Sequence, residues 1–218
     1  MHLSLDTFIL STLLSGAQAA LEAPIAGYSV IIPEWDVQAY PGGTKKAVPL
    51  NGTIQEVHAQ LLQINPDYDS SFDRSLSGMA RLSQITTDPE KHIILHGDNE
   101  FVGANYTCGN NTWGHAITGQ IEDGIQYLRK VVGKPKAHAG PQACGRVSCS
   151  FGSAIWWCND NTSPKELEDF SVIASGAHYL RIQKQCKLGY MFYHEYYMRG
   201  QVFHKDGWSV IVRGDKCK

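Results

Sequence analysis

Six cysteines restrict the fold of this 218-residue chain more than any other feature, because all six lie after residue 107. An even number of cysteines in an exported chain indicates disulfides that form in an oxidising compartment. Metal ligation is the weaker alternative, since the chain has no Cys-x-x-Cys pair and the nearest cysteines, Cys144 and Cys149, lack a matching second pair. We therefore predict three disulfides among Cys108, Cys144, Cys149, Cys158, Cys186 and Cys217.

The amino terminus supplies the export signal. Residues 8–14 form an apolar run that is far shorter than the ~20 residues of a membrane helix. The small-x-small pattern Ala17-Gln18-Ala19 follows, so we predict a signal peptide at residues 1–19 and a secreted, extracellular product. The chain also holds four N-glycosylation sequons, which agree with a eukaryotic secretory route; these are at Asn51, Asn105, Asn110 and Asn161.

Charge divides the mature chain into two parts. Residues 20–107 hold eleven acidic and five basic residues, a net charge of −6, and no cysteine. Residues 108–218 hold nine acidic and fourteen basic residues, a net charge of +5. Either the acidic segment packs on a basic, cysteine-rich domain, or it is a removable prosegment. We favour packing, because the segment contains regular apolar patterns that a solvated tail does not need.

Those patterns predict a strand and a helix in the acidic segment. Residues 28–32 alternate and are β-branched, and Pro33 ends them. A capping box of Thr53 and Glu56 begins a helix with apolar residues at helical spacing, which Asn65-Pro66 stops. Weaker patterns predict a short helix at residues 72–82 and strands at residues 92–96 and 101–106.

The cysteine-rich part reads as helix, hairpin, helix, hairpin. Apolar residues repeat every three or four positions over 117–128, and a second helix is predicted to begin at Ser163-Pro164. One hairpin joins residues 146–150 to 154–158, and Asp206-Gly207 turns the other between 200–204 and 208–212. This order predicts an α+β fold, an antiparallel sheet with two helices on one face, stapled by disulfides.

The disulfide pairing stays open at this point. In a symmetric first hairpin Cys149 would face Cys158 across the strands. That pair belongs to only some of the fifteen connectivities that six cysteines allow.

Several segments of the cysteine-rich part resemble a fungal family of small secreted, cysteine-rich, effector-like proteins, grouped with necrosis-inducing extracellular proteins and smut killer toxins. The segments are residues 140–150, 153–161, 200–204 and 208–212, and the resemblance covers roughly half the chain. Residues 50–53 and 60–66 are similar to the leaders of such proteins. The resemblance implies a killer-toxin-like α/β sandwich and an action on other organisms through binding or membrane perturbation. It transfers no catalytic residue, and the toxins are more cysteine-dense and lack the acidic half.

Catalytic motifs are absent from the sequence. It contains no Gly-x-Ser-x-Gly elbow, phosphate-binding glycine loop or His-Glu-x-x-His motif. His204 with Glu195 or Asp206 is the candidate acid–base pair of a secreted ribonuclease, which is the alternative hypothesis. His92 and His96 would lie about 13 Å apart on a strand, too far to chelate one ion, so we predict no metal site and no cofactor.

Aromatic and basic residues are the candidates for binding. Trp156 and Trp157 are adjacent on a predicted strand, so they point to opposite faces, and one of them is available for recognition unless another element covers it. A further aromatic cluster is more typical of packing than of sugar binding; it comprises Tyr190, Phe192, Tyr193, Tyr196 and Tyr197. Basic residues near the carboxy terminus outnumber acidic ones and suit an anionic surface; they are Arg199, Lys205, Arg213, Lys216 and Lys218.

These observations favour a secreted effector or toxin-like protein that binds a host or competitor molecule and catalyses nothing. Its partner would be a protein, a wall polymer or a membrane component, and the near-neutral formal charge of −2 gives no indication of nucleic-acid binding. A small secreted hydrolase and a structural cell-wall protein are the alternatives.

Overall fold

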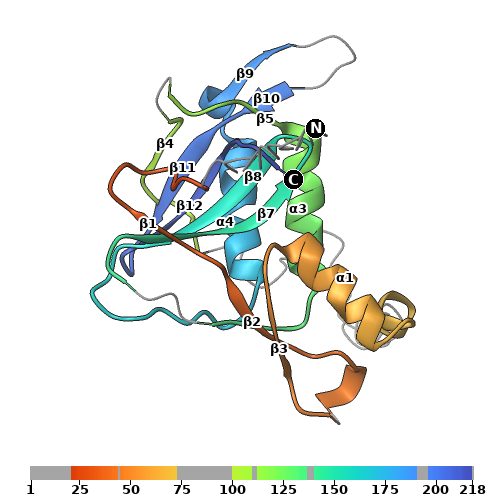
Figure 1. Ribbon diagram of the computed structural model, residues 1–218. Coiled ribbons are helices and arrows are strands. Elements are labelled where there is room, and N and C mark those ends of the chain that lie inside the picture. The colour runs from red at the N-terminus through yellow and green to blue at the C-terminus, as the bar shows by residue number, and fades with distance from the viewer. Residues whose placement is uncertain are drawn as a thin grey trace, which may run out of the picture.

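Two β-hairpins of the cysteine-rich part form the centre of a mixed six-stranded sheet in the computed structural model (Figure 1). The structure describes residues 21–43, 45–72, 100–109, 112–136, 140–190 and 196–217. Several features of the sequence analysis lie outside these residues. They are the predicted signal peptide, most of the predicted helix at 72–82, His92, His96, Asn110, Glu195 and Lys218.

Both predicted hairpins are confirmed. The first joins β7 to β8 and the second joins β11 to β12, while β12 also pairs with β8. The strand order is β1-β7-β8-β12-β11-β4, and every pair is antiparallel except β1 with β7. The sheet is therefore mixed, not purely antiparallel as predicted, because a strand from the acidic segment joins its edge. The strand bounds are β1 Ser29–Ile31, β4 Tyr106–Thr107, β7 Ala143–Ser150, β8 Ser153–Asn159, β11 Gly200–His204 and β12 Trp208–Gly214.

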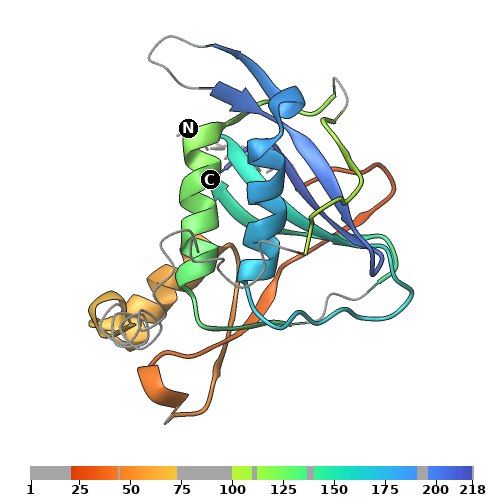
Figure 2. The same cartoon turned by 180° about the vertical axis from the view of Figure 1, so that it is seen from behind.

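Two helices cover one face of this sheet, as Figure 2 shows from behind. They are α3 (Thr118–Lys130) and α4 (Ser171–Ile182), and they pack on each other and on the hairpin strands. The predicted start of the second helix at Ser163-Pro164 is wrong. Leu167 and Phe170 are buried before the helix begins, and the Asp169 carboxylate accepts the backbone N–H of Ser171 at the true start.

The described part of the acidic segment contributes to the same core. Strand β2 (Glu34–Val37) pairs with β3 (Val48–Asn51) and with β6 (Gly133–Pro135) of the cysteine-rich part. Trp35 is fully buried and stacks on Phe170, with 4.9 Å between the ring centroids. Helix α1 (Ile54–Ile64) begins with the predicted capping box, formed by Thr53 and Glu56. Apolar burial and strand pairing thus join the two parts of the chain.

Short elements complete the fold. A turn occupies residues 101–103, where a strand was predicted, and strand pairing begins only at β4. A separate three-stranded sheet has the order β5-β10-β9 and lies near the amino-terminal end of α3 in Figure 1. These remaining elements are η1 Pro41–Gly43, β5 Ala116–Ile117, η2 Lys184–Cys186, β9 Lys187–Tyr190 and β10 Tyr196–Met198.

The three predicted disulfides are present, with a pairing that the sequence left open. They join Cys108 to Cys186, Cys144 to Cys158, and Cys149 to Cys217. The pair Cys149 with Cys158 is wrong, because the two-residue turn sets Cys149 opposite Ala154. A β-bulge at Val147 then shifts the register by one residue and brings Cys144 opposite Cys158.

A second apolar cluster lies on the outer face of the sheet, opposite α3 and α4. It contains Trp113, Trp156, Ile211 and the buried Cys144–Cys158 disulfide. Residues 23–30 of the acidic segment pack against it. The hydroxyl of Tyr28 donates to Oδ1 of Asp160 at 2.6 Å, and this hydrogen bond links residues 23–30 to the loop after β8. The amino-terminal residues of the described chain therefore shield the outer face of the sheet from water.

The raised pKa values of two tyrosines predict how the free energy of unfolding changes at alkaline pH. The hydrogen bond to Asp160 raises the pKa of Tyr28 to about 12, and burial raises the pKa of Tyr68 to about 12. The unfolded chain, whose tyrosines have the ordinary pKa of 10.0, releases these protons first. Their stabilising contribution is therefore complete below pH 10 and is lost as the pH rises to 12.

We expect the free energy of unfolding to fall over this pH interval in wild-type protein and to fall less steeply in the variant Tyr28→Phe/Tyr68→Phe. Denaturant titrations at several pH values measure both slopes. Equal slopes for the two proteins would contradict the assignment of this pH dependence to the two phenols.

Candidate functional site

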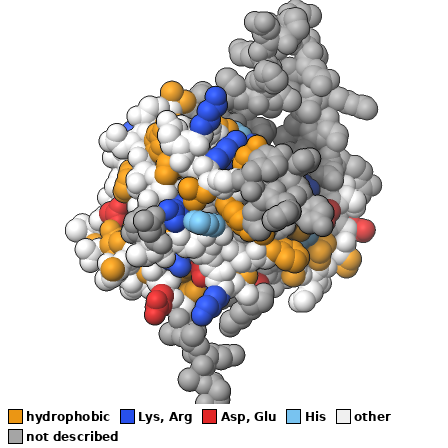
Figure 3. Space-filling view, turned by 90° about the horizontal axis from the view of Figure 1, so that it is seen from above, with side chains coloured by type: hydrophobic (Ala, Val, Ile, Leu, Met, Phe, Trp, Pro, Cys, Tyr) orange, Lys and Arg blue, Asp and Glu red, His pale blue; other side chains and the backbone are white. Residues whose placement is uncertain are grey.

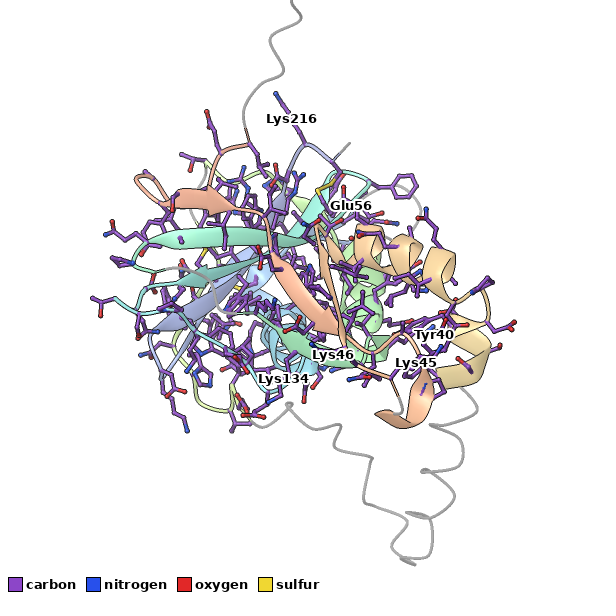
Figure 4. The ribbon with its side chains drawn as sticks, turned by 60° about the horizontal axis from the view of Figure 1, so that its bottom comes forward. Tyr40, Lys45, Lys46, Glu56, Lys134 and Lys216 are labelled. Carbon is purple, nitrogen blue, oxygen red and sulfur yellow. A yellow bond between two sulfur atoms is a disulfide. The ribbon has the colours of Figure 1, made fainter. Side chains whose placement is uncertain are left out.

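A groove of about 1540 Å³ crosses one end of the outer face, between the amino-terminal segment, the start of α1 and the carboxy terminus. We call it the outer groove. Its position is marked in Figure 4 by Glu56 and Lys216, which lie at the same end of the molecule. The groove is lined by residues 21–22, 30–33, 51–53 and 213–217 and by Glu56, Ala59, Gln60, Gly114 and Arg146.

The carboxy-terminal residues Asp215–Cys217 form one wall of the groove, and we call them the C-terminal strap. The strap runs from the end of β12 across the outer face to β7, where Cys217 is bonded to Cys149. Nε1 of Trp156 donates to Oδ2 of Asp215 at 2.9 Å, and Nη1 of Arg146 donates to the carbonyl oxygen of Lys216 at 2.9 Å. A covalent bond and two hydrogen bonds thus hold this wall in place.

Close backbone contact fixes the floor beside the strap. The N–H of Gly214 donates to the carbonyl oxygen of Gly114 at 2.7 Å. A Cβ on Gly214 would lie only 2.6 Å from the carbonyl oxygen of His115. Glycine at position 214 therefore lets the end of β12 approach residues 114 and 115 where the strap begins.

Positive charge gathers at the strap end of the groove. Arg146 has a side chain that is 12% exposed, and its Nε has no hydrogen-bond partner among the described residues. Its nearest carboxylate oxygen, Oδ1 of Asp215, lies 3.9 Å from Nη1 and already accepts the backbone N–H of Lys216. Arg213 donates Nε to the carbonyl oxygen of Gly214, and Lys216 is exposed. The described residues therefore satisfy only part of the guanidinium donors at this end.

The other walls differ in character. Leu21 and Val30–Ile32 give an apolar wall, and the Ile32 side chain is 71% exposed. Glu22 and Glu56 add two carboxylates to the lining, although Oε2 of Glu56 also accepts the N–H of Thr53 at 2.7 Å in the capping box. The described lining contains no aromatic side chain. The groove therefore combines arginines and a lysine at the strap with apolar side chains and two further carboxylates.

Comparison with protein-family models, with curated proteins and with solved structures found no match.

The two predicted binding tryptophans are both buried. Trp156 is 0% exposed beneath residues 23–30 and supports the strap through its indole N–H. Trp157 is 1% exposed on the opposite face, in the core under the helices. The strand alternation places them on opposite faces as expected, and neither ring offers a surface for direct contact.

The basic candidates do not form one patch. Arg213 and Lys216 line the groove, whereas Nη1 of Arg199 donates to the carbonyl oxygen of Trp113 and lies beside His115. Lys205 is exposed in the hairpin turn at the far end of β12. Figure 3 shows basic side chains scattered among apolar ones on the face seen from above. The sequence analysis missed Arg146, Glu22 and Glu56, because nothing in their local pattern indicates that they meet around one groove.

His204 and Asp206, the candidate acid–base pair, lie outside the outer groove, and the His204 ring is buried. The His204 side chain is 4% exposed and stacks on Trp208 with 4.4 Å between centroids. Its Nε2 lies 3.2 Å from Oε2 of Glu100, and its Nδ1 accepts the backbone N–H of Asp206 at 3.2 Å. Because both nitrogens are engaged and the ring is buried, this geometry fits a histidine that fastens the hairpin turn to the residues around Glu100.

The described residues contain no group of three or more histidine, cysteine, aspartate or glutamate side chains that could hold a metal ion. They also contain no helix with the length and apolar content needed to cross a bilayer.

The three sequons within the described residues differ in their surroundings. Asn51 and Asn105 are exposed, and Asn51 lines the outer groove. Nδ2 of Asn161 instead donates to Oδ1 of Asn159 and to the carbonyl oxygens of Asp206 and Gly207. A glycan on that nitrogen would replace one of its two hydrogens, so it would weaken the contact between this loop and the second hairpin.

Proposed function

We propose that this protein is a secreted, non-enzymatic effector or toxin-like protein that binds a host or competitor molecule through the outer groove. The observation that carries the proposal is the incompletely paired cationic end of a groove whose walls are fixed by a disulfide and by strand pairing. Binding sites gain affinity when their donors are held in place before the ligand arrives. The predicted signal peptide and three disulfides support an extracellular place of action.

The resemblance to secreted fungal proteins with a killer-toxin-like α/β sandwich supports the same proposal. Two hairpins and two helices on one face agree with that architecture. This chain differs in its acidic segment, which supplies β1, β2 and α1. A binding role through the groove therefore need not follow the mode of action of the toxins.

Hydrolysis is the weaker proposal. The carboxylates of Glu100 and Asp206 flank His204, as acid–base chemistry would require. The buried ring, however, has no free nitrogen directed toward a substrate. A broad hydrolytic screen tests this alternative, and turnover that is lost in a His204→Ala variant would replace our proposal.

A pair of charge-reversal variants tests the binding site. Arg213→Glu lies in the groove, and Lys205→Glu makes the same charge change at the other end of β12. We expect Arg213→Glu to weaken binding of labelled protein to target cells or wall fractions by about tenfold or more, and Lys205→Glu by less than about twofold, because charge pairs in partly desolvated sites outweigh exposed ones. Fluorescence titration of both variants measures the difference.

Equal binding by wild type, Arg213→Glu and Lys205→Glu would show that the outer groove is not the contact surface. Retention of the protein in the producer's own wall, with no binding to other cells, would favour a structural cell-wall protein instead.

A further inference from the structure

We propose that the outer groove binds an extended peptide segment of a partner protein, with an acidic side chain of that segment held between Arg146 and Arg213. This inference rests on the proposed function and names the partner's chemistry. The segment would lie along β1 and present apolar side chains to the wall that contains Val30 and Ile32.

The carboxylate site follows from the positions of the two arginines. Arg146 on β7 lies opposite Trp156 on β8, and Trp156 lies opposite Ile211 on β12. Arg213 is two residues beyond Ile211 on the same strand, so both arginines project from the outer face. Two strand spacings across and two residues along the sheet separate their Cα atoms by about 12 Å. Side chains as long as arginine can reach one anion from both positions.

The hydrogen-bonding capacity of these residues fits a carboxylate. A guanidinium has five N–H donors, and for Arg146 the only hydrogen bond found among the described residues goes to the carbonyl oxygen of Lys216. Asp215 forms an ion pair with Arg146, but Oδ1 of Asp215 lies 3.9 Å from Nη1 of Arg146, beyond hydrogen-bond distance. The Asp215 carboxylate accepts from Trp156 and from the backbone N–H of Lys216. A ligand carboxylate would supply acceptors that the described part of the chain does not provide, in a geometry that arginine favours.

The remaining walls favour a peptide over a charged polymer. Glu22 and Glu56 would repel an anion that carries negative charge at every repeat, such as a polyuronate. Sugar rings also stack on aromatic side chains, and the described lining has none. A peptide can instead place one carboxylate at the arginines, apolar side chains at Ile32, and a basic side chain near Glu56.

The edge of the sheet offers backbone contacts to such a peptide. β1 is the terminal strand of the six-stranded sheet, and in the described part of the chain no strand pairs with its outer edge. Extended peptides bind other proteins by adding a strand at an edge of this kind, where main-chain hydrogen bonds give affinity and side-chain sites give selectivity. Val30 and Ile31 belong to this edge strand and line the groove, and the lining continues along Ile32 and Pro33.

A phage-displayed library of random 12-residue peptides tests the proposal. The library is selected on disulfide-intact protein secreted from a eukaryotic host, before and after enzymatic removal of N-glycans, because Asn51 lies in the groove lining. We expect enriched peptides to share an Asp or Glu at a fixed position. Replacing that residue by its amide should weaken binding by about tenfold in fluorescence anisotropy, as should Arg213→Ala and Arg213→Glu.

Reversal of both charges provides the sharpest control. A peptide with Lys in place of the shared acid should regain affinity for Arg213→Glu, whereas Lys205→Glu should bind the original peptide within about twofold of wild type. Far-ultraviolet circular dichroism and intact mass confirm that each variant is folded with three disulfides. Peptides without a shared acid, peptides that bind Arg213→Glu as well as wild type, or no enrichment at all would overturn the proposal.

Oligogalacturonate serves as a separate probe. If it binds through Arg213 while no peptide does, the peptide proposal fails and binding by the groove remains as the function. If cell binding is unchanged in Arg213→Glu, the proposed function itself fails, whatever the peptides do.

Discussion

Replacing Trp35 with alanine is expected to lower the free energy of unfolding by about 3–5 kcal/mol. The Trp35 ring is fully buried, stacks on Phe170, and donates its indole N–H to the carbonyl oxygen of Gly52 at 2.7 Å. Removing it leaves a cavity where β2 of the acidic segment meets the loop before α4. Denaturant unfolding monitored by circular dichroism measures the change.

Val102→Ala is the matched control, because that side chain is 75% exposed. Its substitution should change the free energy of unfolding by less than about 0.5 kcal/mol. A loss below about 1 kcal/mol in Trp35→Ala would contradict the burial of the acidic segment in a shared core. Such a result would instead favour a segment that can be removed, as a prosegment would be.

Removing the Cys108–Cys186 disulfide is expected to have an effect of similar size. The two cysteines are 78 residues apart, and the loop-closure relation assigns about 4.5 kcal/mol to a cross-link of that span. Globular domains have net stabilities of about 5–15 kcal/mol, so the variant Cys108→Ala/Cys186→Ala should lose a large share of its stability. Its denaturation midpoint, compared with that of wild type, measures the loss.

The Cys144–Cys158 disulfide gives the internal comparison, since its cysteines are only 14 residues apart. The same relation assigns it about 3 kcal/mol. Both pairs include fully buried sulfur atoms, so packing losses add to each value. A wild-type protein with six free thiols, or a Cys108→Ala/Cys186→Ala variant as stable as wild type, would contradict the view that disulfides stabilise this fold.

Local signals in the sequence predicted the elements that depend on neighbouring residues. The capping box of Thr53 and Glu56, the turn at Asp206-Gly207 and the helix ending before Gly133 all involve contacts within a few positions along the chain. The helix start at Ser163-Pro164 failed because burial of Leu167 and Phe170 outweighs a local capping preference. Tertiary packing thus set the boundary that propensity misplaced.

The candidate site was much less predictable than the elements. Arg213 was a candidate from the sequence, but Arg146, Glu22 and Glu56 were not, since they belong to three segments more than 30 residues apart. The parallel pairing of β1 with β7, the packing of α1 on β7 and the crossing of the C-terminal strap together bring these segments to one groove.

The sequence alone determined the number of disulfides, the hairpins and helices α1 and α3, because cysteine parity and short-range periodicity act within the chain. The tertiary structure decided which cysteines pair, where the tryptophans lie and which charges meet. A single bulge at Val147 sets Cys144, and not Gly145, opposite Cys158. Such outcomes depend on register and on packing between distant segments, and no local pattern encodes either of them.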